Sequence, residues 1–237
     1  MTFHVKPADT SVPETPPAPP SAQGVFSHRL PVAEQFADLL TREATVRGLI
    51  GPREVPRLWE RHLLNCAVIT ELMPEGSAVC DIGSGAGLPG IALAIRRPDL
   101  RVTLVEPLLR RTTFLDLATS TMELTNVSVH RGRAEELHGE AVFDVVTSRA
   151  VAPMDRLTRW SLPLVRDGGL FLAMKGAAAE REVDSAAPEI RRLGGADQRV
   201  VTVGAHWLST PVTVVQVRKT GTPGRSRQSG RRQGGGR

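Results

Sequence analysis

The chain has 237 residues, of which 41% are hydrophobic and 23% charged, and its formal net charge is +5. This length fits one globular domain, and no apolar run approaches the roughly 18 residues that a membrane helix needs. The amino terminus lacks the basic and then apolar stretches of a signal peptide, so we expect a cytoplasmic protein, and a monomer. Its two cysteines, Cys66 and Cys80, form no Cys-x-x-Cys pair and no zinc-like cluster, which predicts reduced thiols and no bound metal.

The net charge comes from the carboxyl-terminal tail. Residues 220–237 contain five arginines and no acidic residue, which equals the whole net charge and leaves residues 1–219 neutral. A tail of Gly, Arg, Gln and Ser has little to bury, so it is predicted to be disordered. It is suited to lie along phosphates, and equally to serve as a solubilising extension.

The first part of the chain is divided by composition. Residues 1–22 are rich in Pro, Ser and Thr and are predicted to be a disordered leader outside the fold. Folded sequence is expected from near Leu30. Residues 30–73 have apolar side chains at helical spacing, interrupted between Gly48 and Pro56, which predicts two or more helices that form an amino-terminal cap.

From residue 77 onward, predicted strands and helices alternate. Strands are expected at 78–82, 102–106, 127–130, 142–148, 169–175, 198–203 and 212–218. Helical stretches are expected at 88–97, 108–124, 134–137, 153–165 and 177–193. This alternation predicts an α/β, Rossmann-like domain with a mainly parallel sheet and helices on both faces. The last two strands are joined without a helix, so they are predicted to pair antiparallel.

The most informative segment follows the first strand. Residues 79–90 read Val-Cys-Asp-Ile-Gly-Ser-Gly-Ala-Gly-Leu-Pro-Gly. Without a Cβ, Gly83, Gly85 and Gly87 let the backbone approach a ligand closely. Read from Gly85, the string also satisfies the G-x-G-x-x-G of dinucleotide sites, with Glu106 at about the distance of a ribose-binding acid. An NAD-binding site is therefore an alternative interpretation of this segment.

Three features favour S-adenosylmethionine (SAM) over NAD. The carboxylate of Asp81, just before the glycines, suits the cationic amino-acid end of SAM better than a pyrophosphate. The resulting D-x-G-x-G pattern resembles the SAM-binding loop of class I methyltransferases. In that class an acid at the position of Glu106 binds the ribose hydroxyls. The third strand is followed by residues 133–137, Arg-Ala-Glu-Glu-Leu, where the class places residues around adenine.

A narrower resemblance rests on residues 81–91, where Leu-Pro-Gly follows the third glycine. This segment resembles the RsmG (GidB) family of bacterial 16S ribosomal RNA guanine-N7 methyltransferases. Supporting matches lie at 59–65 (Trp-Glu-Arg-His-Leu-Leu-Asn), 110–115 (Arg-Arg-Thr-Thr-Phe-Leu), 147–150 (Thr-Ser-Arg-Ala) and 174–176 (Met-Lys-Gly). The resemblance runs from about residue 30 to 219, and gives the domain bounds 23–219, with the Rossmann-like core at 77–219.

The resemblance implies an enzyme that transfers a methyl group from SAM to N7 of a guanine in the decoding-region loop of 16S rRNA, with the rRNA or the small ribosomal subunit as partner. The cofactor contacts carried over by position are Gly83, Leu88, Glu106, Ala134, Glu135 and Arg149. The RNA-facing basic residues are Arg111, Arg149 and Lys175, and of these Arg149 and Lys175 are the catalytic candidates. Many relatives have Asp where Asn65 stands, and residues 47–51 also depart from the family pattern, a variation that resembles the actinobacterial branch.

The chemistry agrees with the motifs. Guanine N7 carries a lone pair and no proton, so methyl transfer needs in-line positioning and electrostatic tuning, and no strong base. The Asn/Asp-Pro-Pro-Tyr/Phe motif of amino-group methyltransferases is absent, and neither cysteine is placed as the nucleophile of a carbon-5 pyrimidine enzyme. The alternatives are a small-molecule SAM methyltransferase, a non-catalytic RNA-binding module and, more distantly, an NAD-dependent oxidoreductase.

Each of the singled-out residues could have a functional or a purely structural role. Arg149 at a strand end is interpreted as functional because the edge of the cofactor pocket lies there. Lys175 could equally extend to solvent along an apolar stem. His62 is interpreted as a hydrogen-bonded structural histidine. The three tryptophans, Trp160 among them, are assigned to the core or the cap.

Overall fold

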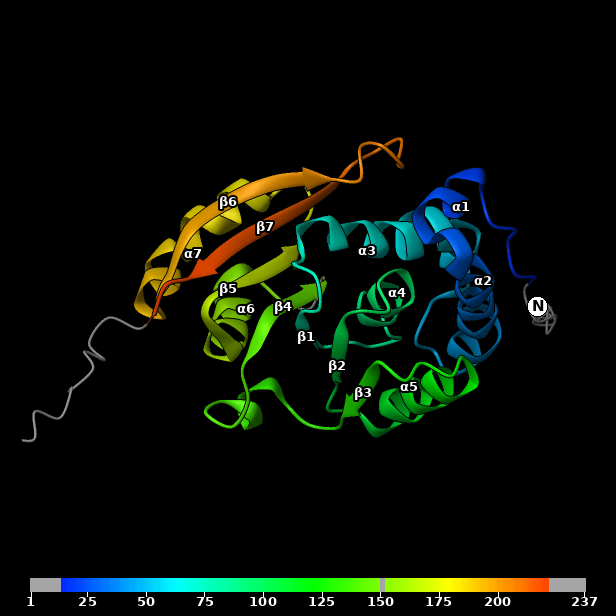
Figure 1. Cartoon of the computed structure of the whole chain (residues 1–237), viewed down its shortest axis with the longest axis horizontal. Coiled ribbons are helices and arrows are strands. Elements are labelled where there is room, and N and C mark those ends of the chain that lie inside the picture. The colour runs from blue at the N-terminus through cyan, green and yellow to red at the C-terminus, as the bar shows by residue number, and fades with distance from the viewer. Residues whose placement is uncertain (1–13, 150–151, 222–237) are drawn as a thin grey trace, which may run out of the picture.

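The computed structural model describes residues 14–149 and 152–221, which form a seven-stranded sheet with helices on both faces (Figure 1). The predicted tail from residue 222 and the first 13 residues of the predicted leader lie outside the described residues. Within the described ranges, no helix is long and apolar enough to cross a membrane, and no group of three or more His, Cys, Asp and Glu could hold a metal ion.

The sheet has the strand order β3-β2-β1-β4-β5-β7-β6. Its strands are β1 (Ala78–Ile82), β2 (Arg101–Val105), β3 (Val127–His130), β4 (Phe143–Arg149), β5 (Val165–Met174), β6 (Gly195–Val203) and β7 (Val212–Lys219). The first five strands are parallel, and β7 pairs antiparallel with both β5 and β6. The seven strands, the parallel sheet and the antiparallel final pair are therefore confirmed.

One strand boundary differs from the prediction. β5 starts at Val165 and not at residue 169, so it takes over the end of the helix predicted at 153–165. Val165 pairs with Phe143, and the register then shifts before Leu170 pairs with Val145. Two adjacent glycines, Gly168 and Gly169, predict a turn from the sequence alone. The irregular pairing lets the strand continue through them.

The longer helices are α1 (Pro20–Phe26), α2 (Leu30–Leu39), α4 (Gly90–Arg96), α5 (Leu109–Thr121), α6 (Met154–Ser161) and α7 (Ala179–Arg192). Shorter helical turns are η1 (Ser27–Arg29), η2 (Leu40–Ala44), η3 (Pro52–Arg57), η4 (Leu58–Leu64), α3 (Asn65–Ala67), η5 (Val68–Leu72), η6 (Ala134–Leu137) and η7 (Leu162–Leu164). The run from η3 to η5 is the second part of the predicted cap. The helical stretches predicted in the core are confirmed, with shifted ends.

The predicted end of the leader, at residue 22, was wrong. Helix α1 begins at Pro20, and Ala22, Val25 and Phe26 are buried. The indole Nε1 of Trp59 donates to the carbonyl oxygen of Pro16 at 2.9 Å. The Pro-rich composition concealed a short amphipathic helix, in which a proline in the first turn is favourable because its missing N–H has no helical partner there.

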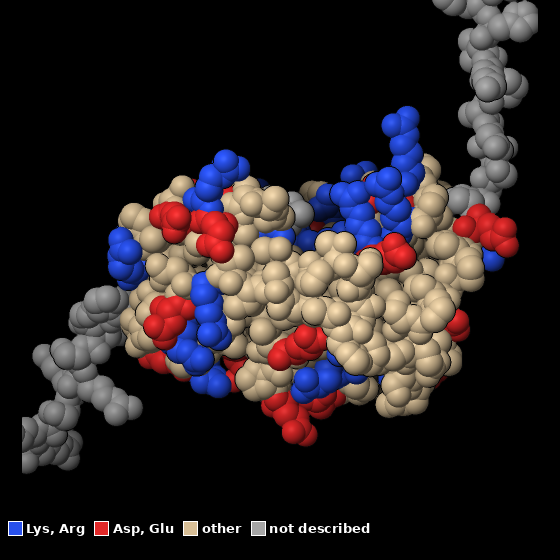
Figure 2. All heavy atoms as spheres, turned by 90° about the horizontal axis from the view of Figure 1, so that it is seen from above, with Lys and Arg blue, Asp and Glu red and all other residues tan. Residues whose placement is uncertain are grey.

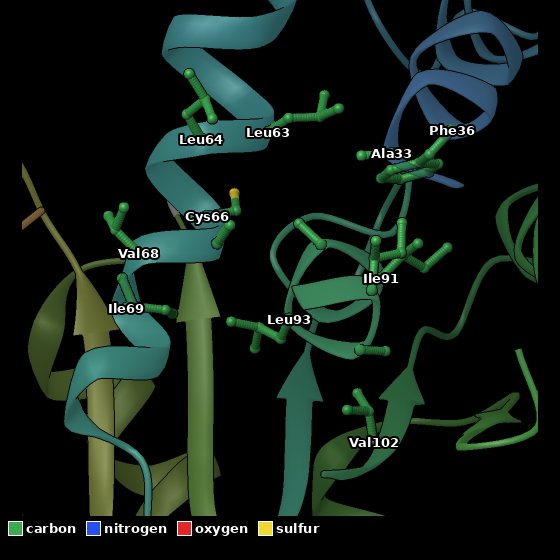
Figure 3. Close-up of a cluster of buried hydrophobic side chains, with 14 of the residues drawn as sticks. Ala33, Phe36, Leu63, Leu64, Cys66, Val68, Ile69, Ile91, Leu93 and Val102 are labelled. Carbon is green, nitrogen blue, oxygen red and sulfur yellow. The ribbon is translucent and has the colours of Figure 1, made fainter. Parts of the chain in front are cut away.

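Two apolar layers hold the sheet. On one face, the cap and α4 pack together: side chains of the cap such as Leu63 and Ile69 lie beside Ile91 and Leu93 of α4 (Figure 3). The other face packs against α6 and α7. Alternate residues of β1 point to opposite faces, so Cys80 belongs to the second layer. The cap thus sits directly over the edge of the sheet where the glycine loop begins.

Candidate functional site

The glycine loop connects β1 to α4 at the carboxyl edge of the sheet. Gly83, Gly85 and Gly87 have φ values of 71°, 57° and 86°, a region in which a side chain is strained. A Cβ at Gly87 would meet Cδ1 of Ile91 at 2.4 Å, whereas a Cβ at Gly85 would meet only the Gly83 carbonyl, at 3.9 Å. Gly87 is therefore needed for packing, and Gly85 leaves open space above the loop.

Asp81 lies beneath this loop. Its side chain is fully buried, and Oδ2 accepts a hydrogen bond from the backbone N–H of Gly90 at 2.9 Å. Oδ1 has no hydrogen-bond partner among the described residues. Burial raises the pKa of this carboxyl to about 7. In this structure Asp81 anchors the start of α4, and its predicted contact with the amino end of a ligand stays a prediction.

Glu106 follows the end of β2 and is held by three donors. Oε2 accepts from the backbone N–H of Gly85 at 3.1 Å and from Nη1 of Arg111 at 3.2 Å, and Oε1 accepts from the N–H of Leu108 at 3.1 Å. The side chain is 1% exposed. A carboxylate can accept about four hydrogen bonds, so this fixed group retains capacity to accept from ligand hydroxyls.

The first of three hollows is a cavity of about 300 Å³ above Glu106. Five predicted site residues line it, namely Gly83, Glu106, Arg111, Ala134 and Glu135. The prediction missed Trp160 and Leu108, which complete its apolar wall. The sequence assigns Trp160 to the core or the cap, yet the side chain is partly exposed. The guanidinium carbon Cζ of Arg156 lies over its ring, 5.9 Å from the ring centroid. An apolar slot with one fixed carboxylate can take a flat base and a ribose.

The second cavity, also of about 300 Å³, lies over the glycine loop and shares Gly83 and Arg111 with the first. The loop and β4 contribute the predicted residues Gly85, Leu88 and Arg149. The cap contributes Leu49, Ile50, Gly51, Glu54 and His62, which the prediction did not place in the site. Asp81 and Gly87 are not among the described residues that line either cavity.

The third hollow is a groove of about 970 Å³ at the ends of β4 and β5. Arg149 and Lys175 line it, together with Arg61 and Asn65 of the cap and residues 210–213 before β7. Because Arg149 lines both the second cavity and the groove, this residue marks the boundary between them. Figure 2 shows one group of Lys and Arg side chains at the upper right of this face, in the half that holds the cap in Figure 1, and further ones interspersed with Asp and Glu over the rest of the face.

The other two basic candidates are already paired. Nζ of Lys175 donates to Oε2 of Glu182 at 2.7 Å and to the carbonyl oxygen of Ala152 at 2.8 Å, and only 7% of its side chain is exposed. Arg111 binds Glu106 and lines the two cavities; it is not among the described residues of the groove. Their predicted contacts with RNA stay predictions.

Arg149 is held by the cap. Its Nη1 donates to Sγ of Cys66 at 3.0 Å, and its Nη2 hydrogen-bonds to Nδ1 of His62. The other ring nitrogen of His62, Nε2, lies 2.9 Å from Oε2 of Glu54. His62 is thus hydrogen-bonded as predicted, and it also lines the second cavity. Burial, with Arg149 beside it, lowers the pKa of His62, and the hydrogen bond from His62 lowers the pKa of Glu54.

Comparison with known proteins finds close relatives. A family model described as "rRNA small subunit methyltransferase G" (GidB) matches residues 29–209. The ribosomal RNA small subunit methyltransferase G of Nocardioides sp. is 56% identical over 86% of this chain and 82% of its own length. The protein of the same name from Thermobifida fusca is 50% identical over 99% of this chain and 97% of its own length.

Solved structures show the same fold. TrmN from Thermus thermophilus superposes with a TM-score of 0.50 and 17% identity, covering 64% of this chain and 47% of that one. A ribosomal protein L11 methylase from Lactobacillus delbrueckii subsp. bulgaricus superposes with a TM-score of 0.50 and 11% identity, covering 67% of this chain and 77% of that one. These likenesses, with the strand order, confirm the predicted class I methyltransferase fold.

Proposed function

This chain belongs to the GidB family, rRNA small subunit methyltransferase G, and from that premise we propose that it transfers a methyl group from SAM to N7 of a guanine in the decoding-region loop of 16S rRNA. The acceptor is the rRNA itself or the small ribosomal subunit, and an acceptor in the ribosome implies a protein that works in the cytoplasm. The observation that carries the proposal is the arrangement of Glu106, between the glycine loop and the cavity that Ala134 and Glu135 line.

The residues present fit SAM. The fixed carboxylate of Glu106 keeps room to accept a hydrogen bond from a ribose hydroxyl, and the segment at Ala134 and Glu135 lies where the adenine would sit. The glycines and Leu88 leave space for the amino-acid end in the second cavity. That cavity holds the carboxylate of Glu54 as well as the guanidiniums of Arg111 and Arg149, and this mixture of charges suits an amino-acid end that carries both an ammonium and a carboxylate.

The acceptor belongs in the groove beyond Arg149. When bound, SAM supplies a methyl group activated by its sulfonium charge. The lone pair of guanine N7 forms the new bond to the methyl carbon as the carbon–sulfur bond breaks, and the positive charge passes to the base. No proton moves, so the protein's task is to orient the base and exclude water. Arg149, at the boundary of the groove, is placed to contact the base or its phosphate, and Lys175 to support it.

A small-molecule acceptor is the second candidate, because residues 1–219 carry no net charge. The volume and charge of the groove argue against a small acceptor. At about 970 Å³ the groove is about three times the size of either cavity, and its wall includes Arg61 and Arg149 besides the paired Lys175 and Glu182, which leaves a positive lining suited to an extended polyanion. A non-catalytic RNA-binding module would bind RNA and SAM and release no demethylated product. Transfer of a labelled methyl group from SAM into 16S rRNA separates the three.

Cofactor choice gives the first prediction. SAM or its demethylated product should raise the melting temperature of the protein at submillimolar concentration, and NAD should not. A ligand present at a hundredfold excess over its dissociation constant adds about 2.7 kcal/mol to the free energy of unfolding, a shift that differential scanning fluorimetry resolves. Glu106→Ala should abolish the SAM shift because the ribose loses its acceptor. Stabilisation by NAD alone would overturn the assignment of both cavities.

A further inference from the structure

Two side chains of the cap and one from the sheet form a hydrogen-bonded series at the boundary of the second cavity. Glu54 comes from η3, His62 from η4 and Arg149 from the end of β4. We propose that Glu54 and His62 are positioning residues, which hold the guanidinium of Arg149 in the orientation that methyl transfer requires. This inference rests on the proposed function, because it assigns to the cap a part in that reaction.

Arg149 determines which atoms donate and which accept in this series of hydrogen bonds. A guanidinium only donates, so Nδ1 of His62 must accept from Nη2 of Arg149. The single proton of the neutral imidazole is then on Nε2, which donates to Oε2 of Glu54 at 2.9 Å. Glu54 therefore selects the ring tautomer that Arg149 needs. The opposite tautomer would point an N–H at the guanidinium and release it.

The charges around His62 keep its ring neutral. Burial and the positive charges of Arg149 and Arg61 lower the pKa of His62, and Glu54 opposes them. The neighbouring Cys66 thiol, which contacts the other side of Arg149, is fully buried, and its pKa is raised. Burial raises the pKa of Asp81 to about 7, and the charge of Arg149 opposes that rise only in part. A proton added to His62 would convert its acceptor into a donor and break the contact with Arg149.

The three hydrogen-bonded side chains lie where cofactor and acceptor would meet, so a change in their positions would affect the reaction. Glu54, His62 and Arg149 all line the second cavity, and Arg149 continues into the groove. A guanidinium freed from the cap could reorient in a groove of about 970 Å³. A displacement of about 1 Å in a positioning group can lower the rate about a hundredfold. The cap helices are thus part of the catalytic arrangement as well as a cover for the sheet.

The test compares His62→Ala, His62→Asn and Glu54→Gln with wild type in steady-state transfer of labelled methyl from SAM to 16S rRNA. His62→Ala should lower kcat/KM about 10- to 100-fold. His62→Asn should recover most of that loss, because the amide oxygen can take the place of Nδ1 as acceptor. Glu43→Gln is the matched control: Glu43 pairs with Arg47 on the cap, lies outside the described walls of all three hollows, and should behave as wild type.

The pH profile separates positioning from a merely structural role. Wild-type activity should fall on the acid side as His62 gains a proton. Since Glu54 raises the pKa of His62, Glu54→Gln should shift this acid limb to lower pH. His62→Asn should remove the part of the limb that His62 contributes, because an amide does not titrate. In the unsubstituted protein, ¹⁵N spectra of the imidazole should show His62 protonated on Nε2 and not on Nδ1, with the signal assigned from its loss in His62→Asn.

Two sets of results would overturn the proposal. The first set concerns the variants. Either His62→Ala has the kcat/KM of wild type, or His62→Ala and His62→Asn lose the same share of kcat/KM and the acid limb of the pH profile does not change. The other is the Nδ1-protonated tautomer of His62 in the wild-type spectrum. If wild type transfers no methyl group to RNA, the proposed function fails and this proposal with it. If wild type transfers and the variants match it, only this proposal fails.

Discussion

Gly90→Ala is expected to lower the free energy of unfolding by about 3 kcal/mol, because it forces a methyl group into a filled contact. A Cβ at Gly90 would lie 2.2 Å from Cδ2 of Leu104 and 2.8 Å from Oδ2 of Asp81. Leu104 is fully buried in β2, and Asp81 accepts the Gly90 N–H through that same oxygen. Neither side chain can withdraw without opening the core or leaving a buried carboxylate without its donor.

The same substitution should weaken SAM binding beyond detection, since α4 carries the end of the glycine loop that forms the second cavity. Urea unfolding and scanning fluorimetry with SAM would measure the two effects. Gly176→Ala is the matched control for stability: a Cβ there meets nothing within 4 Å, so its change should stay within about 0.5 kcal/mol. A Gly90→Ala protein as stable as wild type would show that α4 does not lie this close to the sheet.

Arg149→Ala is expected to lower kcat for methyl transfer by about 100-fold or more, the loss typical of removing one oriented donor from an active site. Arg149 lines both the cofactor cavity and the acceptor groove, so its removal affects their junction. The domain should stay folded, because the side chain is only partly buried and lies at the end of β4. Arg149→Lys should retain part of the activity, since an ammonium keeps the charge and loses the planar fork.

Transfer of labelled methyl from SAM to 16S rRNA under single-turnover conditions would measure the loss, with the melting temperature as a check on folding. Arg159→Ala serves as control, since Arg159 lies on α6, pairs with Asp155 and is absent from the described walls of the three hollows. Arg149→Ala transferring at the wild-type rate would make Arg149 a structural residue and would require another group at the junction.

The sequence predicted the sheet well because its signals are local. The predicted bounds of β1 and β3 match the observed ones, because each is a short stretch flanked by glycine or polar residues. The predicted cofactor residues also gather, since the carboxyl ends of parallel strands meet at one edge of the sheet and the glycine loop, Glu106 and the segment at Ala134 all follow strand ends.

The unpredicted parts depend on how the cap sits on the sheet. His62 and Arg149 are 87 residues apart, and no periodicity in either segment fixes the rotation of η4 over β4. Nothing in the sequence predicts that Trp160 lines the first cavity, because an aromatic residue on an amphipathic helix is equally expected in the core. The motif predicts Asp81 as a ligand contact, whereas in the structure its Oδ2 accepts the Gly90 N–H, a contact that depends on how α4 packs against β1.

The central claim is tested most directly by mapping the methyl group. 16S rRNA, or the small subunit, from cells that lack the gene would be incubated with the purified protein and isotope-labelled SAM, and the product digested and analysed by mass spectrometry. The account predicts one new methyl group, on N7 of a single guanine in the decoding-region loop, and its much slower appearance at the same atom with Arg149→Ala. A methyl group on another atom or in another region, or label that stays with SAM, would contradict it.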